Sequence, residues 1–220
     1  MNPSLILVNY GVGNMASIRN ALSAISCSFI EISHGPVDAD QDSVFILPGV
    51  GSFHHASFEL RRRQLYDSLT VPNVRILGIC LGMQLLFCDS SEGTISDGLA
   101  LIDGNIRPII EHTSYHSHIK LPHIGWQPLQ FHLNTNSSLR FLDIAKGQDF
   151  YFVHSYMAMN IPPEHNYASV SYGNINIPAI VLKDGCVGFQ FHPEKSGRTG
   201  LSLLSNTVDY LMNYRPESST

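Results

Sequence analysis

Short apolar runs alternate with amphipathic stretches in the first half of the chain. Four runs favour strands, at residues 5–8, 29–32, 44–47 and 74–79. Between them, apolar residues recur at helical spacing, first at Ile18, Ala21, Leu22 and Ile25 and later at Phe58, Leu60, Leu65 and Leu69. Strands that alternate with helices of this length indicate βαβ units and a mainly parallel sheet.

Beyond Gly98 the pattern changes to shorter apolar runs separated by Pro, Gly, Asn and His. We expect strands at 106–110, 129–133, 150–153, 167–170, 179–182 and 187–191, with a turn at Lys183-Asp184-Gly185. A closing helix over 200–211 presents Leu201, Leu204, Val208 and Leu211. Since neither a repeat nor a linker is visible, we expect one domain over 1–213 and a disordered tail over 214–220.

Composition narrows the class of protein. A chain of 220 residues with a formal net charge of −5 fits one globular domain and does not favour nucleic acid or an acidic membrane as a partner. The N-terminus lacks the basic and apolar regions of a signal peptide, so we expect a cytoplasmic protein. Four cysteines without a CxxC pair argue against a zinc site or a disulfide framework. The densest histidine group, His112, His116 and His118, reads as a solvated loop rather than a metal site.

The segment Gly78-Ile79-Cys80-Leu81-Gly82 has the spacing of a nucleophile elbow. Glycines two residues before and after the nucleophile remove Cβ atoms that would collide in a tight strand-to-helix turn. The following helix N-terminus would favour the thiolate of Cys80. A lone cysteine in an apolar strand is more often a packing residue, so its partners decide between the two interpretations.

Two further segments supply such partners. His192 follows an apolar run and Glu194 comes two residues later, so in an extended chain both would share a face. Glu194 could then orient His192 toward a nucleophile, as in a catalytic triad. The glycine-rich end of another strand, Pro48-Gly49-Val50-Gly51, could aim the N–H of Gly51 at an oxyanion together with the N–H of Leu81.

Together these residues resemble the class I glutamine amidotransferases, and within them the glutaminase subunit of imidazole glycerol phosphate synthase. The matching segments, in family order, are Tyr10–Asn14, Leu47–Gly51, Gly78–Gln84, Pro122–Trp126, Tyr151–Tyr156 and Gly188–Ser196. The resemblance implies a flavodoxin-like α/β sandwich with a mainly parallel central sheet and additional antiparallel strands.

The resemblance also implies a reaction. Cys80 would attack the side-chain amide carbon of L-glutamine, His192 would protonate the leaving nitrogen, and water would hydrolyse the thioester. Substrate would be held by residues that the family motifs place around the nucleophile, here Gly49, Gln84, His154, Ser155 and Tyr156. Neither a metal nor an organic cofactor is expected.

The same resemblance implies a partner. In this family a (β/α)8-barrel cyclase receives the ammonia and forms a heterodimer with the glutaminase. The heterodimer produces imidazole glycerol phosphate and AICAR in histidine biosynthesis. Substrate bound to the cyclase stimulates the glutaminase. Asn14, Trp126, Tyr151 and Lys195 would lie near this interface. Core packing is the alternative interpretation of Trp126 and Tyr151.

Some positions depart from the family pattern. Asn9 stands where aspartate is usual, Gln127 where asparagine is usual, and Cys88 where glutamate is usual. Because of these departures, a second interpretation stays open: the chain would be a paralogous subunit that supplies ammonia for amidino-sugar formation in surface polysaccharide. A cysteine-elbow hydrolase or chaperone would usually have histidine in place of Leu81, and a non-catalytic relative would have lost Cys80, His192 or Glu194.

Overall fold

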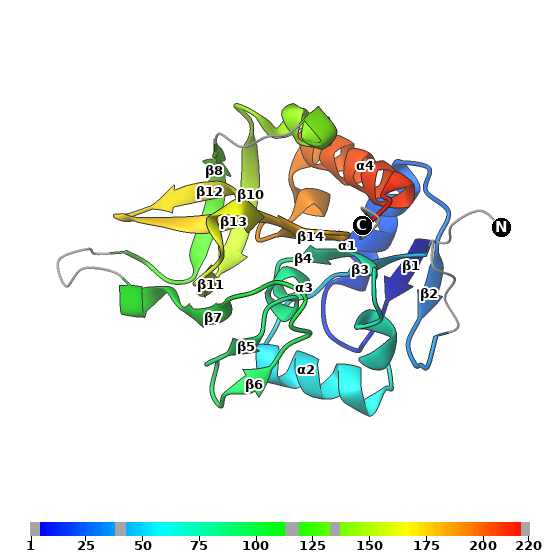
Figure 1. Ribbon diagram of the computed structural model, residues 1–220. Coiled ribbons are helices and arrows are strands. Elements are labelled where there is room, and N and C mark those ends of the chain that lie inside the picture. The colour runs from blue at the N-terminus through cyan, green and yellow to red at the C-terminus, as the bar shows by residue number, and fades with distance from the viewer. Residues whose placement is uncertain (1–4, 38–42, 113–118, 133–136, 217–220) are drawn as a thin grey trace.

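An eight-stranded sheet forms the centre of the molecule. The computed structural model describes residues 5–37, 43–112, 119–132 and 137–216 (Figure 1). The strand order is β2-β1-β3-β4-β14-β13-β12-β9. The strands span Leu5–Val8 (β1), Ile30–Ile32 (β2), Val44–Leu47 (β3), Arg75–Ile79 (β4), Gln130–Phe131 (β9), Asn166–Tyr172 (β12), Ile175–Lys183 (β13) and Cys186–Phe189 (β14). The five strands from β2 to β14 are parallel and the remaining three pair antiparallel, which confirms the predicted class of sheet.

Helices cover both faces of this sheet. Helices α1 (Met15–Ala24) and α4 (Gly197–Asn213) lie on one face and α2 (Phe53–Arg62) on the other, as Figure 1 shows. Successive side chains of a strand point to opposite faces, so a strand buried on both faces is apolar throughout. Strand β1 shows this directly, because Leu5 and Leu7 join the core under α1 and α4 while Ile6 and Val8 join the core under α2.

Two smaller sheets extend the molecule beyond the parallel strands. One pairs β8 (His123–Pro128) with β10 (Asp149–His154), and the other has the order β11-β7-β5-β6. The strands of the second sheet are Asp89–Ser90 (β5), Ser96–Asp97 (β6), Asn105–Pro108 (β7) and Tyr156–Met159 (β11). Of these six strands the sequence predicted only β7 and β10.

The helical prediction after β3 needs a correction. Helix α2 ends at Arg62, so Leu65 and Leu69 lie in the loop and the 3-10 turn that follow it. Phe58 is 54% exposed and does not belong to the buried face, which Phe53, Ala56 and Leu60 form instead. The spacing joined residues of two separate elements into one apparent apolar stripe.

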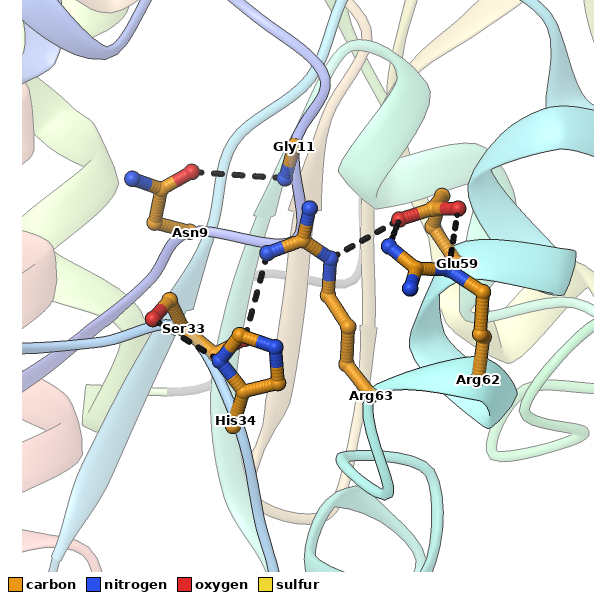
Figure 2. A network of polar contacts seen from close by, with 7 residues as sticks. All are labelled: Asn9, Gly11, Ser33, His34, Glu59, Arg62 and Arg63. Atoms are coloured by element: carbon orange, nitrogen blue, oxygen red, sulfur yellow. Dashed lines mark hydrogen bonds and ion pairs between the residues drawn. The ribbon is translucent and has the colours of Figure 1, made fainter.

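A polar network links the end of α2 to the loop after β2, and Gly11 of the loop after β1 lies against it (Figure 2). The carboxylate of Glu59 accepts from Arg62 at 2.7 Å and from Arg63 at 2.8 Å, and Arg63 also donates to the carbonyl oxygen of Ser33 at 3.3 Å. Gly11 has a φ of +88°, and a Cβ on it would lie 2.6 Å from the guanidinium of Arg63. The glycine therefore lets the loop approach this arginine.

Asn9, one of the departures from the family pattern, has a structural explanation. Its amide donates to the Glu31 carboxylate at 2.8 Å, and Arg19 binds the same carboxylate through two contacts of 2.6 Å. An aspartate at position 9 would face Glu31 with a second negative charge. Asparagine is therefore matched to glutamate at position 31.

Among the described residues, no helix has the length and apolar character needed to cross a bilayer. Position 112 ends a 3-10 helix that begins at Ile109, and the remaining histidines of the predicted loop, at 116 and 118, lie outside the described residues. Of the tail predicted over 214–220, residues 214–216 follow the end of α4 without regular secondary structure, and residues 217–220 lie outside the described residues.

Candidate active site

Cys80 occupies the sharp turn between β4 and helix α3 (Leu81–Leu85), with φ 53° and ψ −107°. A positive φ is unusual for a residue with a side chain and marks local strain. A Cβ on Gly78 would lie 2.6 Å from the carbonyl oxygen of Gly82. A Cβ on Gly82 would lie 1.6 Å from the carbonyl oxygen of Leu47. The geometry confirms the predicted elbow, and both glycines are required by close backbone approach.

His192 and Glu194 form a buried pair. Nδ1 of His192 lies 2.8 Å from Oε1 of Glu194, and the two side chains are 2% and 6% exposed. The contact was predicted, but the reason given for it was wrong. Strand β14 ends at Phe189, and Glu194 sits in the 3-10 turn Pro193–Lys195, so a turn rather than an extended chain brings the carboxylate back to the ring.

The charge state of His192 follows from its neighbours. Burial lowers the pKa of the imidazole, but the Cys80 sulfur and the Glu194 carboxylate outweigh burial and raise the pKa to about 10. Nε2 is buried and forms no hydrogen bond with any residue that the structure describes. An imidazolium beside the Cys80 sulfur can deliver a proton from Nε2.

A cavity of about 260 Å³ opens at the elbow. Its lining residues come from the loop after β3, the elbow and α3, the turn between β5 and β6, and the junction of β10 and β11. They are Val50, Gly51, Cys80, Leu81, Gln84, Glu92, Val153, His154, Ser155 and Tyr156. The structure thus brings together the predicted nucleophile, both predicted oxyanion donors and four of the five predicted substrate residues. The fifth, Gly49, is buried directly before Val50.

Gln84 is fixed in the wall of this cavity. Its Nε2 donates to the carbonyl oxygen of Tyr156 at 3.4 Å and to Oε1 of Gln190 at 3.1 Å. Gln190 is fully buried, and its own Nε2 donates to the sulfur of Cys80 at 3.8 Å. Because both hydrogens of the Gln84 amide are engaged, its Oε1 is oriented as an acceptor.

The predicted oxyanion donors are not both aimed at the cavity. The N–H of Leu81 donates to the carbonyl oxygen of Gly49 at 3.4 Å. The hydroxyl of Tyr10 holds the neighbouring carbonyl of Pro48 at 2.6 Å. An oxyanion could receive the Leu81 N–H only after the Gly49 carbonyl has turned away.

Glu92 is a cavity residue that the sequence did not reveal. Its Oε2 accepts from the N–H of Phe53, the first residue of α2, at 2.7 Å. It is the one acidic residue among those that line the cavity in the described structure. The surrounding segment Ser91-Glu92-Gly93 reads as an ordinary turn, so only the spatial placement identifies it.

The predicted interface residues have different settings. Trp126 is 51% exposed, which overturns core packing as its role, and its ring meets that of Tyr151 edge-on at 6.0 Å. Nζ of Lys195 lies 5.9 Å from the ring centroid of Tyr151. Asn14 caps α1 by accepting from the N–H of Ser17 at 3.2 Å. Tyr151 is half-buried and links the tryptophan to the lysine.

Within the described part of the chain, no three His, Cys, Asp or Glu side chains are grouped so that they could hold a metal ion. The residues around Cys80 can supply acid–base and nucleophilic chemistry with their own side chains. They provide a thiol, an oriented imidazole and hydrogen-bond donors.

Comparison with known proteins agrees with this geometry. The sequence pattern of the family described as "Glutamine amidotransferase class-I" matches residues 6–210. The chain belongs to the class I glutamine amidotransferases. The family assignment confirms the resemblance drawn from the six motif segments and makes the protein an enzyme of the glutamine amidotransferase type.

Several relatives carry the name "Imidazole glycerol phosphate synthase subunit HisH". The chain is 39% identical to that of Geobacillus thermodenitrificans, over 92% of this chain and 93% of the relative. It is 37% identical to that of Bacillus subtilis, over 90% and 92%. The relative named "Imidazole glycerol phosphate synthase subunit HisH 2", from Vibrio vulnificus, is 38% identical over 94% of each chain.

Solved structures support the fold. A protein described as a glutamine amidotransferase superposes with a TM-score of 0.69 at 13% identity, covering 94% of this chain and 98% of the other. A glutamine amidotransferase from Thermotoga maritima gives 0.62 at 12% identity, covering 97% and 99%. The class I amidotransferase sandwich predicted from the sequence is thereby confirmed.

Proposed function

We propose that this enzyme is the glutaminase subunit of an imidazole glycerol phosphate synthase and acts through Cys80, His192 and Glu194. The observation that carries the proposal is the strained Cys80 at the end of a cavity, next to a histidine that Glu194 orients from 2.8 Å. The names of the relatives with 37–39% identity support the choice of synthase.

The reaction follows from these side chains. The thiolate of Cys80 attacks the side-chain amide carbon of L-glutamine, and the carbonyl electrons move to oxygen. Nε2–H of His192 gives its proton to the leaving nitrogen, ammonia departs, and a γ-glutamyl thioester remains. His192 then takes a proton from water, which attacks the thioester and releases glutamate. Glu194 holds the ring and stabilises its charged form.

The cavity offers complementary groups for glutamine. We propose that the Glu92 carboxylate pairs with the substrate's α-ammonium group and that Oε1 of Gln84 accepts a hydrogen bond from the substrate. The segment His154-Ser155-Tyr156 would hold the rest of the amino acid, with Gly49 supporting the cavity wall. The reaction as written needs no cofactor, since each proton and electron pair has a protein group or water as its source.

The partner is proposed to be a (β/α)8-barrel cyclase that receives ammonia in a heterodimer. Asn14, Trp126, Tyr151 and Lys195 are the proposed contact residues, and an exposed tryptophan beside a tyrosine suits a binding surface. Since the Leu81 N–H is engaged by Gly49, docking that turns this carbonyl would activate the glutaminase. One oxyanion donor is worth about 10²–10³ in rate, which sets the scale of the stimulation.

The test compares glutamine and ammonium salts as nitrogen sources. With a histidine-pathway cyclase and its nucleotide substrate, Cys80→Ala should abolish glutamine-dependent turnover and leave ammonium-dependent turnover intact. Cys88→Ser, at a half-buried thiol that makes a contact with the Ile102 carbonyl, is the matched control. Glutamine-dependent turnover by Cys80→Ala would refute the mechanism.

The same assay addresses the acceptor. The identity to a relative numbered "HisH 2" is as high as the identity to the others. A paralogous subunit is therefore the second candidate function. A wild-type chain that is stimulated only by a cyclase-like synthase of amidino-sugar formation would move the function to surface polysaccharide. Stimulation by the histidine-pathway cyclase supports the proposal made here. A cytoplasmic location remains a prediction from the sequence.

A further inference from the structure

Two buried histidines form a pair beside the cavity. His123 of β8 and His154 of β10 are directly opposite in the antiparallel ladder, and Nδ1 of His123 lies 3.0 Å from Nε2 of His154. They are 1% and 6% exposed. The ring of His123 is stacked between Phe152, at 5.1 Å, and Tyr172, at 4.1 Å. The reaction proposed above makes no use of His123.

The contact between His154 and Tyr156 determines which ring nitrogens of the pair carry hydrogens. Nδ1 of His154 lies 2.8 Å from the carbonyl oxygen of Tyr156, which can only accept, so this nitrogen carries a hydrogen. Burial lowers the pKa of His154 to about 3 and that of His123 to about 4, so both rings are neutral at pH 7. Nε2 of His154 is then an acceptor, and Nδ1 of His123 must be its donor.

The far nitrogen of the pair supports this assignment. With its hydrogen on Nδ1, His123 has a bare lone pair on Nε2. That atom is buried and has no hydrogen-bond partner in the described part of the chain. An N–H left unpaired there would be a costlier defect than an unused lone pair in the same apolar stack of rings.

The pair is connected to the nucleophile through the cavity wall. The Tyr156 carbonyl that accepts from His154 also accepts from Gln84 at 3.4 Å. Gln84 donates in turn to Gln190, whose amide lies 3.8 Å from the sulfur of Cys80. The orientation of the His154–Tyr156 turn and that of the Gln84 amide are thus set by one shared carbonyl.

We propose that His123 is a positioning residue: by donating to His154 it holds that ring in the Nδ1–H form and so fixes the turn that cradles glutamine. Without this donor, Nε2 of His154 would be a buried acceptor with no partner. The ring could then move its hydrogen to Nε2 and lose the bond to Tyr156. The inference rests on the proposed glutaminase function, because the cradle matters only if glutamine binds there.

The tautomers can be measured in the wild-type chain without any substrate. Nitrogen-15 NMR of histidine-labelled protein at pH 7, assigned with His154→Gln and His123→Asn, should show both rings protonated at Nδ1 and bare at Nε2. A hydrogen on Nε2 of His154, or a charged ring, overturns the proposal. The tautomers are read in the wild-type chain, so this result does not depend on the activity of a substituted chain.

Two substitutions separate the hydrogen bond from packing. His123→Phe keeps a ring between Phe152 and Tyr172 but loses the donor, whereas His123→Asn keeps an amide donor near the Nδ1 position and loses the ring. In the complex with the cyclase, His123→Phe should raise the KM for glutamine about tenfold while ammonium-dependent turnover is unchanged. His123→Asn should recover most of that loss.

The outcomes distinguish this proposal from the function beneath it. A wild-type KM in His123→Phe would show that His123 acts only by packing. Equal losses in both variants would contradict the role given to its N–H donor, because His123→Asn keeps that donor. A wild-type chain with the expected tautomers that hydrolyses no glutamine with any partner would refute the glutaminase function, and with it the substrate role given to His123.

Discussion

Gly82 lies against the carbonyl oxygen of Leu47 so closely that a Cβ on the glycine would be 1.6 Å from that oxygen. This contact joins the elbow helix to the end of β3, and both elements line or support the cavity at Cys80. The nucleophile can occupy its turn only because residue 82 has no side chain.

Gly82→Ala is therefore expected to be severely destabilising. The Cβ of residue 82 would clash with the backbone carbonyl group of Leu47. Because moving a flexible side chain cannot relieve this clash, the elbow must distort or open. Urea denaturation followed by circular dichroism should show a loss of several kcal/mol in the free energy of unfolding, or no folded protein.

Gly147→Ala is the control, since nothing lies within 4 Å of its Cβ position and only its φ of +69° opposes alanine. That control should cost about 1–2 kcal/mol. Equal losses in the two variants would contradict the argument.

The Glu194–His192 contact predicts the effect of removing one charge. Glu194→Gln keeps the shape of the side chain but no longer stabilises the imidazolium and can present an N–H to Nδ1. The pKa of His192 should fall, because this carboxylate is one of the groups that raise it. We expect kcat for glutamine to drop by about 10²–10⁴ with KM nearly unchanged.

The measurement is steady-state glutaminase kinetics in the presence of the cyclase partner. Glu164→Gln, at an exposed position in a 3-10 turn, provides the control and should behave like wild type. An unchanged kcat in Glu194→Gln would remove Glu194 from the catalytic machinery.

The buried histidine pair predicts loss of stability in mild acid. The pKa values of His154 and His123 are lowered in the folded chain to about 3 and about 4, against about 6.5 in an unfolded chain. Below pH 6.5 the unfolded state binds more protons than the folded state, so the free energy of unfolding decreases as the pH falls. The contribution is complete above pH 6.5 and disappears as the pH approaches 4 to 3.

Urea unfolding at pH 7.5 and pH 5 tests this directly. Each histidine adds a slope of at most about 1.4 kcal/mol per pH unit. His123→Phe should show a smaller difference between the two pH values than wild type, whereas His112→Asn, at an exposed position, should not. The same pH dependence in wild type and His123→Phe would show that His123 is not held neutral by the fold.

Much of the parallel sheet and of the triad could be predicted because the evidence is local. Strands such as Leu5–Val8 and Val44–Leu47 are buried on both faces and therefore read as uninterrupted apolar runs, and their bounds agree with the prediction. The elbow is equally local, since the two glycines and Cys80 span five residues. Conformational demands of this kind leave a direct mark on the sequence.

Other features depend on contacts between distant segments. In strand β8 only His123 is buried, and exposed residues alternate with half-buried ones. The strand is therefore stabilised by pairing with β10 rather than by an apolar pattern. Glu92 reaches the cavity because the turn carrying it lies against the start of α2, 39 residues away in sequence. The engagement of the Leu81 N–H by Gly49 is likewise invisible in either segment alone.

The network in Figure 2 gives a last prediction, which compares two neighbouring arginines. Arg62 and Arg63 both bind Glu59, but the side chain of Arg62 is 51% exposed and that of Arg63 is 18% exposed. Arg63 also donates to Ser33 and lies against Gly11. Arg63→Ala should therefore lower the melting temperature clearly more than Arg62→Ala, whose exposed ion pair contributes little. Differential scanning calorimetry of the two variants at low and high salt measures this. Equal shifts would mean that the Arg63 contacts do not anchor the loop after β2 to the end of α2.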